Sequence, residues 1–199
     1  MITDMNTDII IAGVGGQGIL SIAACIGLAA VESNYYLKQS EVHGMSQRGG
    51  AVQSNLRISD REIASDLISL GQANLIVSVE PMESLRYLPW LSDTGWLVTN
   101  TTPVKNINNY PEQDELMREI NKLQNNIIID ADKIARDLGS PRSSNMVMLG
   151  ASTPFINIDY KFIEQAVEKL FHSKGDDVVS INKKALAAGR DYTSMRVKK

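Results

Sequence analysis

The chain has 199 residues, of which 43% are hydrophobic and 22% are charged, a balance typical of a soluble globular protein with a buried core. The formal net charge of -3 provides no basic surface for nucleic acid. The single cysteine, Cys25, excludes an internal disulfide and an iron–sulfur cluster held by four thiolates of this chain. We therefore expect one domain over residues 1–199, with no nucleic-acid partner and no metal site of its own.

The first predicted elements are a buried strand and a helix. Residues 8–14 form a short run rich in isoleucine, and such runs are typical of strands that are covered on both faces. From residue 18 to residue 32 the apolar side chains recur at helical spacing, and Cys25 lies among them as a small core residue. The apolar run 9–12 is too short for a signal peptide or a membrane span, so we expect a cytoplasmic protein without a membrane partner.

Strands and helices continue to alternate along the rest of the chain. Residues 51–58 alternate apolar and polar side chains, as in a strand, and residues 160–171 carry an apolar stripe of helical spacing. The other expected strands are 35–39, 74–80, 95–100 and 126–130, and the other expected helices are 82–91, 112–123, 131–138 and 176–188, with Gly189 ending the last one. The pattern predicts an α/β fold, a Rossmann-like open and mostly parallel sheet with helices on both faces and a helical C-terminal portion.

A glycine-rich segment follows the first expected strand and opens the first expected helix. Residues 13–18 read GVGGQG and match G-x-G-x-x-G, the turn in which dinucleotide-binding folds hold a phosphate. Glycines let the backbone approach a ligand, and free N–H groups at the start of the helix attract an anion. The residues of this candidate cofactor site are Gly13, Gly15, Gly16, Gln17 and Gly18. Two interpretations stay open: an anion site, or glycines that only permit close packing.

A nicotinamide dinucleotide is the least favoured ligand for this segment. In such folds an acidic residue about 20 positions after the glycines, at the end of the second strand, binds the ribose hydroxyls. Residues 36–40 read YLKQS at that place, and Glu41 comes late. Lys38 would suit only a 2′-phosphate.

A second polar segment, residues 41–50, reads EVHGMSQRGG. Its candidate cofactor-binding residues are Glu41, Gln47, Arg48, Gly49 and Gly50. Arg48 is the strongest of them, because a guanidinium beside two glycines can bind a phosphate or carboxylate with two hydrogen bonds. His43 is a weak catalytic candidate, since histidine can move a proton near neutral pH. We expect this loop to share one crevice with residues 13–18, because both lie at the carboxyl edge of the sheet.

Three segments together resemble the gamma-type subunit of the 2-oxoacid:ferredoxin oxidoreductases, and most closely the small subunit of the indolepyruvate-specific subgroup. They are 13–18, 41–50 and 144–151, the last reading SNMVMLGA. The resemblance covers nearly the whole chain, and 41–50 is its most specific part. It implies oxidative decarboxylation of a 2-oxoacid, with indolepyruvate or another arylpyruvate expected, to an acyl-coenzyme A, and transfer of the electrons to ferredoxin.

The same resemblance places thiamine diphosphate, Mg²⁺ and the iron–sulfur clusters in a large partner subunit, with coenzyme A as a co-substrate. This chain is then expected to hold no cofactor alone and to be inactive alone. It lacks Gly-Asp followed at a distance by Asn-Asn, the usual thiamine–magnesium motif. Two other functions stay open: a non-catalytic nucleotide-binding or scaffold protein, and a free NAD(P)-dependent oxidoreductase.

Overall fold

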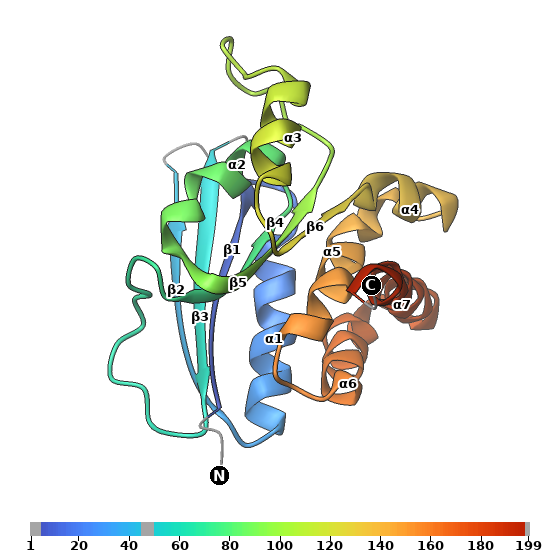
Figure 1. Ribbon diagram of the computed structural model, residues 1–199. Coiled ribbons are helices and arrows are strands. Elements are labelled where there is room, and N and C mark those ends of the chain that lie inside the picture. Colours follow the sequence, from blue (N-terminus) through green and yellow to red (C-terminus); the bar gives the residue numbers. More distant parts are fainter. Residues whose placement is uncertain (1–4, 45–49, 198–199) are drawn as a thin grey trace.

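The computed structural model describes residues 5–44 and 50–197, which form a six-stranded sheet with helices on both faces (Figure 1). The strands are β1 (Asn6–Val14), β2 (Tyr36–His43), β3 (Ala51–Ser59), β4 (Ala73–Ser78), β5 (Leu91–Asn100) and β6 (Asn126–Ile129). The α-helices are α1 (Ile19–Glu32), α2 (Pro81–Arg86), α3 (Gln113–Asn121), α4 (Ala131–Asp137), α5 (Ser144–Ser152), α6 (Tyr160–Phe171) and α7 (Asp176–Val197). The predicted α/β fold is therefore confirmed.

The sheet has the order β2-β3-β1-β4-β5-β6, and its pairing changes at β1. The strands β1, β4, β5 and β6 are all parallel to one another. In contrast, β3 is antiparallel to both β1 and β2, so it lies between two strands that run in the same direction. The second strand is thus one place farther from β1 than in a simple βαβ unit, because β3 lies between them.

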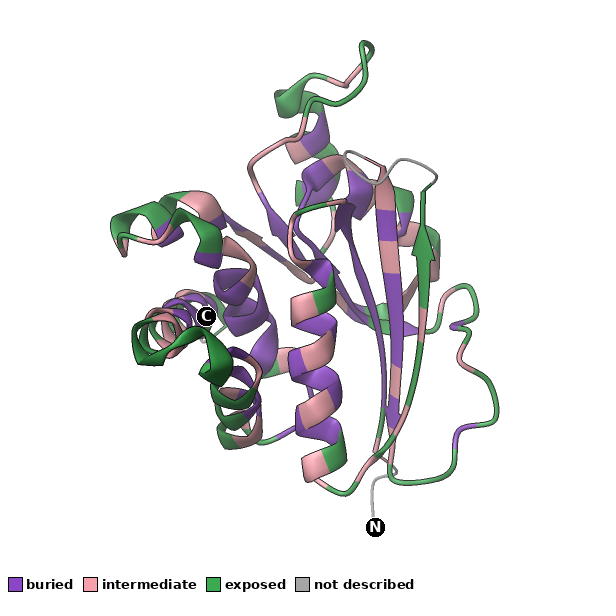
Figure 2. Ribbon diagram, turned by 180° about the vertical axis from the view of Figure 1, so that it is seen from behind, coloured by how far each residue is buried: buried purple, intermediate pink, exposed green. Residues whose placement is uncertain are grey.

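The first strand is buried on both faces, as its isoleucine run predicts. Ile9 and Ile11 belong to the larger apolar cluster, which α1 and α5 cover directly and α6 and α7 close from outside. Ile10 and Ala12 belong to a smaller cluster beneath α2 and α3 on the opposite face. Figure 2 shows the buried colour along the middle strands and the inner sides of the helices. The central half of the sheet therefore has apolar layers on both sides.

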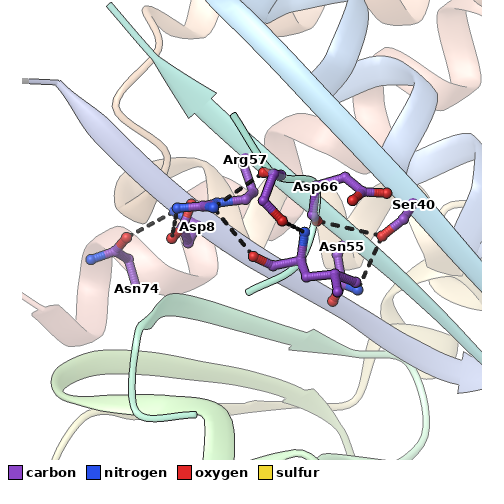
Figure 3. A network of polar contacts seen from close by, with 8 residues as sticks. Asp8, Ser40, Asn55, Arg57, Asp66 and Asn74 are labelled. Carbon is purple, nitrogen blue, oxygen red and sulfur yellow. Dashed lines mark hydrogen bonds and ion pairs between the residues drawn. The ribbon is translucent and has the colours of Figure 1, made fainter. Parts of the chain in front are cut away.

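The β2–β3 half of the sheet is covered differently on the face away from α1. There the segment 60–72 crosses the sheet and is held by Arg57 (Figure 3). The Arg57 guanidinium donates two hydrogen bonds to the buried Asp8 carboxylate, at 2.9 and 3.1 Å. It donates two more to the carbonyl oxygens of Ser65 and Leu67, at 3.1 and 3.2 Å. The Ser40 hydroxyl accepts from the Asn55 amide at 3.3 Å in the same network. Polar contacts thus replace a helix on this part of the sheet.

The last helix corrects a sequence prediction. Gly189 was expected to end it, but α7 continues to Val197. A Cβ atom on Gly189 would lie 1.9 Å from the carbonyl oxygen of Val147, and one on Gly150 would lie 1.9 Å from that of Leu186. Both glycines are therefore needed for the close approach of α5 and α7. No helix within the described ranges is long and apolar enough to cross a membrane.

Candidate functional site

The glycine segment 13–18 forms a turn that its own glutamine holds in place. Gly16 and Gly18 have φ angles of 98° and 76°, in the left-handed region that favours glycine. The side chain of Gln17 accepts a hydrogen bond from the Val14 amide at 2.7 Å and donates one to the Val79 carbonyl at 3.1 Å. Gln17 therefore ties the end of β1 to the end of β4.

The glycines of this turn have different surroundings. A Cβ atom on Gly13 would lie 2.3 Å from Cγ2 of Val79, so at this position glycine is required for packing. A Cβ atom on Gly16 would meet nothing within 4 Å, and among the described residues the Gly16 amide has no hydrogen-bond partner. Close packing therefore accounts for Gly13, whereas Gly16 leaves its backbone open to a ligand.

The two predicted loops meet at the carboxyl edge of the sheet. The Gly15 amide donates to the Gly50 carbonyl at 2.9 Å, and the Gly44 amide donates to the Ala51 carbonyl at 2.9 Å. Between them lies a cavity of about 580 Å³, here called the hairpin pocket, which is lined by Val14, Gly15, Gly16, Gly18, Ile19, Leu20, His43, Gly44 and Val52. The expectation that both segments border one crevice is confirmed for the described residues.

Two residues expected in the second loop belong to a strand instead. Glu41 pairs with Ser54 and His43 with Val52, so β2 continues to His43 because β3 offers partners that far. His43 is half exposed, with Nε2 3.3 Å from Oε2 of Glu41, whose Oε1 accepts from Gln39 at 2.7 Å. His43 lines the hairpin pocket, while the Glu41 carboxylate already has two partners.

The remaining residues of the second segment divide into two groups. Gln47, Arg48 and Gly49 lie outside the described residues, and their role as anion contacts stays a prediction. Gly50 is described, and its carbonyl contacts the glycine turn as given above.

A second cavity lies on the other side of the glycine turn, where the strands β1, β4, β5 and β6 end. It encloses about 470 Å³ and is here called the switch-point pocket, because β1 and β4 are neighbours and the connections that follow them lead in opposite directions, to β2 and to β5. Its lining consists of Gly16, Gln17, Gly18, Val79, Asn100, Asp132, Pro141, Arg142, Ser144, Asn145 and Met148.

Asn100 and Asp132 were missed in the sequence, although Asn100 is the last residue of the apolar strand β5 and Asp132 follows closely after β6. The amide of Asn100 donates to the Asp132 carboxylate at 2.8 Å, and its oxygen accepts from the amides of Thr101 and Ala131 at 3.0 and 3.1 Å. Strand ends at the carboxyl edge of a parallel sheet are where polar site residues are expected, which is the signal that could have identified both.

Asn145, near the start of α5, contacts the glycine turn. Its side-chain amide donates to the Gly18 carbonyl at 3.3 Å, across 127 residues of sequence. It thereby connects the start of α5 to the glycine turn, a contact that only the tertiary structure creates.

Two buried groups bear on what the chain can do. Burial raises the pKa of the Cys25 thiol to about 12, so it stays protonated, in agreement with its predicted place in the core. Glu80 is fully buried after β4 and accepts hydrogen bonds from the Val104 amide at 3.2 Å and from the Tyr110 hydroxyl. Burial first, and then the Glu80 carboxylate, raise the pKa of Tyr110 above its ordinary value. Glu80 therefore holds the loop between β5 and α3.

The described part of the chain shows the features of a binding site. No three His, Cys, Asp or Glu side chains within it are grouped as a metal centre would require. The pockets offer backbone N–H groups, one arginine and one carboxylate, but around them we find no nucleophile paired with a base among the described residues. Such a site can hold and orient a ligand.

Comparison with known proteins identifies relatives of this chain. Indolepyruvate oxidoreductase subunit IorB of Archaeoglobus fulgidus is 32% identical over 194 residues, which cover 93% of this chain and 94% of the relative. The corresponding subunit of Pyrococcus horikoshii is 34% identical over 192 residues, covering 92% and 93%.

A solved structure has the same fold. It is a 2-oxoglutarate:ferredoxin oxidoreductase from Magnetococcus marinus with 2-oxoglutarate, coenzyme A and succinyl-CoA bound, and it superimposes with a TM-score of 0.76 at 19% identity. The match covers 96% of this chain and 31% of that longer chain. The family model described as pyruvate ferredoxin/flavodoxin oxidoreductase matches residues 8–192. The chain therefore belongs to the pyruvate ferredoxin/flavodoxin oxidoreductase family.

Proposed function

We propose that this chain is the small subunit of an indolepyruvate:ferredoxin oxidoreductase. In this proposal it acts in the cytoplasm, as part of a complex that converts a 2-oxoacid and coenzyme A to an acyl-coenzyme A and passes the electrons to ferredoxin. The similarity to two IorB subunits along more than nine tenths of their length supports the choice of an arylpyruvate substrate.

The redox groups do not fit this chain. Its one cysteine is buried in α1 as a protonated thiol, whereas an iron–sulfur cluster needs several accessible thiolates. Thiamine diphosphate needs a bound divalent cation, and this chain lacks Gly-Asp followed at a distance by Asn-Asn, the usual motif for that pair. We therefore assign thiamine diphosphate, Mg²⁺ and the clusters to a larger partner subunit.

The observation that carries the proposal is the meeting of the two glycine segments at the hairpin pocket. The Gly15–Gly50 hydrogen bond brings them together, and Gly16 exposes its backbone there. Such a surface can bind an anionic group of coenzyme A or of a cofactor held by the partner, with Arg48 supplying the charge. This chain's residues would then bind and orient, and the partner would hold the reacting atoms.

Co-expression with the genes that neighbour this one tests the assembly. The expected result is a stable complex with a larger, cysteine-rich chain that contains thiamine diphosphate, and that reduces ferredoxin when indolepyruvate and coenzyme A are both present. The small chain alone should give no turnover. Tight NAD(P) binding by the lone chain, together with no complex, would contradict the proposal.

Substitution Arg48→Ala tests the proposed anion contact within that complex. We expect KM for coenzyme A to rise, or assembly to weaken, while Arg136→Ala, an exposed position on α4 outside both pockets, leaves both unchanged. Unchanged turnover, KM and association in the Arg48 variant would remove this residue from the site.

A further inference from the structure

The two edge strands of the sheet differ in how they are protected from pairing with another strand. At one end, β6 has only four residues, and the Tyr192 hydroxyl of α7 donates to its Ile128 carbonyl at 2.7 Å. At the other end, β2 has eight residues, is largely exposed (Figure 2) and pairs with β3 without a register shift. Sheets usually shorten, bulge or cover their edges, or place charges and proline there. Of these features β2 has its charged side chains, Lys38 and Glu41, and no proline.

The hydrogen-bond pattern shows which backbone groups of β2 face outward. The Gly44 amide donates to the Ala51 carbonyl at 2.9 Å, and this pair continues the register of β2 and β3. Hydrogen-bonded residues alternate along an antiparallel strand, so the even-numbered residues of β2 bond to β3 and the odd-numbered ones face away. Among the strands that the structure describes, β2 has no neighbour on that outer side. The amides and carbonyls that remain available there are those of Leu37, Gln39 and Glu41.

The two exposed apolar side chains of β2 share one face of the sheet. Tyr36 is 53% exposed and Val42 is 59% exposed. Both have even numbers, so they lie on the face that the segment 60–72 crosses, because side chains alternate between the faces of a strand. Leu67 and Leu70 of that segment are each 64% exposed. Apolar surface therefore accompanies the available backbone groups on this side of the molecule.

We propose that two copies of this chain associate through β2. The two strands lie side by side and antiparallel, around a two-fold axis that passes through Gln39 perpendicular to the sheet. In this register the outward backbone groups of Gln39 bond to those of the second copy, and those of Leu37 bond to Glu41. The two six-stranded sheets then form one continuous sheet, and each face of one copy continues into the same face of the other.

The side chains favour this register over its neighbours. Tyr36 of one copy lies opposite Val42 of the other, twice around the axis, in pairs without backbone hydrogen bonds, where side chains approach most closely. Pairs of an aromatic and a β-branched residue stabilise a sheet, whereas like charges directly opposite destabilise it. Lys38 lies opposite Ser40. An axis at Lys38 would place two lysines opposite each other, an axis at Glu41 would place two carboxylates opposite each other, and an axis at Ser40 would place Val42 opposite Lys38.

Sedimentation equilibrium of the full chain tests the association. The proposal goes beyond the function given above, because it needs neither the larger subunit nor turnover. We expect a reversible dimer that Gln39→Pro abolishes, since proline lacks the amide that bonds across the axis. Proline fits there because that amide faces away from β3. Gln39→Ala loses the same side chain but keeps the amide, so it should dimerise like the unchanged chain. A chain that is monomeric up to about 1 mM, or dimers of equal strength in both variants, would overturn the proposal.

Two charge substitutions test the register and do not depend on the proline variant. Val42→Asp and Tyr36→Lys should each raise the Kd of the dimer about tenfold or more, because each places a charge opposite an apolar side chain. The double variant puts each new cation opposite a new carboxylate of the second copy, so it should recover most of the affinity. Within one chain the two positions are roughly 20 Å apart and cannot pair. No recovery in the double variant would exclude the axis at Gln39.

Amide hydrogen exchange, followed by NMR spectroscopy, tests which side of β2 is covered. The outward amides of Leu37, Gln39 and Glu41 should exchange more slowly as the protein concentration rises, while the amides of Lys38 and Ser40, which bond to β3, stay protected throughout. Protection of the outward amides only in the complex with the larger chain would assign this edge to that chain and overturn the proposal. Failure of the complex to form in co-expression would contradict the proposed function and leave the dimer unaffected.

Discussion

The glycine turn after β1 and the contact between α5 and α7 both depend on glycine, but for different physical reasons. In the turn, Gly16 has a φ of 98° and open space where a side chain would be. In the helix contact, Gly150 and Gly189 are helical, and each would place a Cβ 1.9 Å from a carbonyl oxygen of the other helix. Conformational freedom matters in the first case, and the missing Cβ matters in the second. The G-x-G-x-x-G spacing indicates only the first.

The largest expected effect follows from Gly189→Ala. Its Cβ would collide with backbone atoms of α5, which cannot rotate away, so the two helices must separate. We expect a loss of about 4 kcal/mol or more in the free energy of unfolding, measured by urea denaturation. Gly27→Ala in α1 is the matched control, because its nearest neighbour, at 3.0 Å, is the flexible end of Leu37. It should be neutral or slightly stabilising, and equal losses in both variants would contradict the comparison.

Gly13→Ala should have the next largest effect. The new Cβ would lie 2.3 Å from Val79 Cγ2, a side chain that is 3% exposed and has little room to move. We expect a destabilisation of about 2 to 3 kcal/mol, typical of an overpacked core. Because Val79→Ala removes the colliding atom, the double variant should lose less stability than the sum of the two single ones. Strict additivity would show that Gly13 is not limited by this contact.

Gln17→Ala tests whether the turn needs its side-chain bridge. The substitution removes the hydrogen bonds to the Val14 amide and the Val79 carbonyl, and we expect a loss of about 1 to 2 kcal/mol in thermal or urea unfolding. The exposed Gln72 provides the control, with a change close to zero for Gln72→Ala. If both variants unfold alike, another contact holds the ends of β1 and β4 together.

The smallest stability effect is expected for Gly16→Ala, which should have the clearest effect on binding. A left-handed backbone costs a non-glycine residue about 1 kcal/mol. Gly71 also has a positive φ, 70°, with open space around it and a position outside both pockets, so Gly71→Ala should cost a similar amount of stability. Only the Gly16 variant should weaken turnover of the complex. Equal turnover by both variants would make the Gly16 conformation purely structural.

Several features of the site could be predicted because they depend on neighbours in sequence. The isoleucine run of β1, the glycine turn and the amphipathic stripe of α6 all follow from local spacing, and the structure confirms them. The end of β2 could not be placed in the same way, since Glu41 and His43 are polar and residues 41–43 become a strand only through pairing with β3. The contact of Asn145 with Gly18 spans 127 residues and leaves no local signal.

By itself, the sequence determined the α/β class, the family resemblance and the meeting of two glycine-rich segments at one sheet edge, because periodicity and motif spacing are local properties. Only the tertiary structure decided that β3 separates β2 from β1, that Gly189 serves a helix contact instead of a helix end, and that Asn100, Asp132 and Arg142 line a second pocket. Those outcomes depend on which distant backbones approach each other. The physical reason is distance along the chain. Strands pair, helices collide and pocket walls form between segments that are far apart in sequence, and a local sequence pattern carries no information about such contacts.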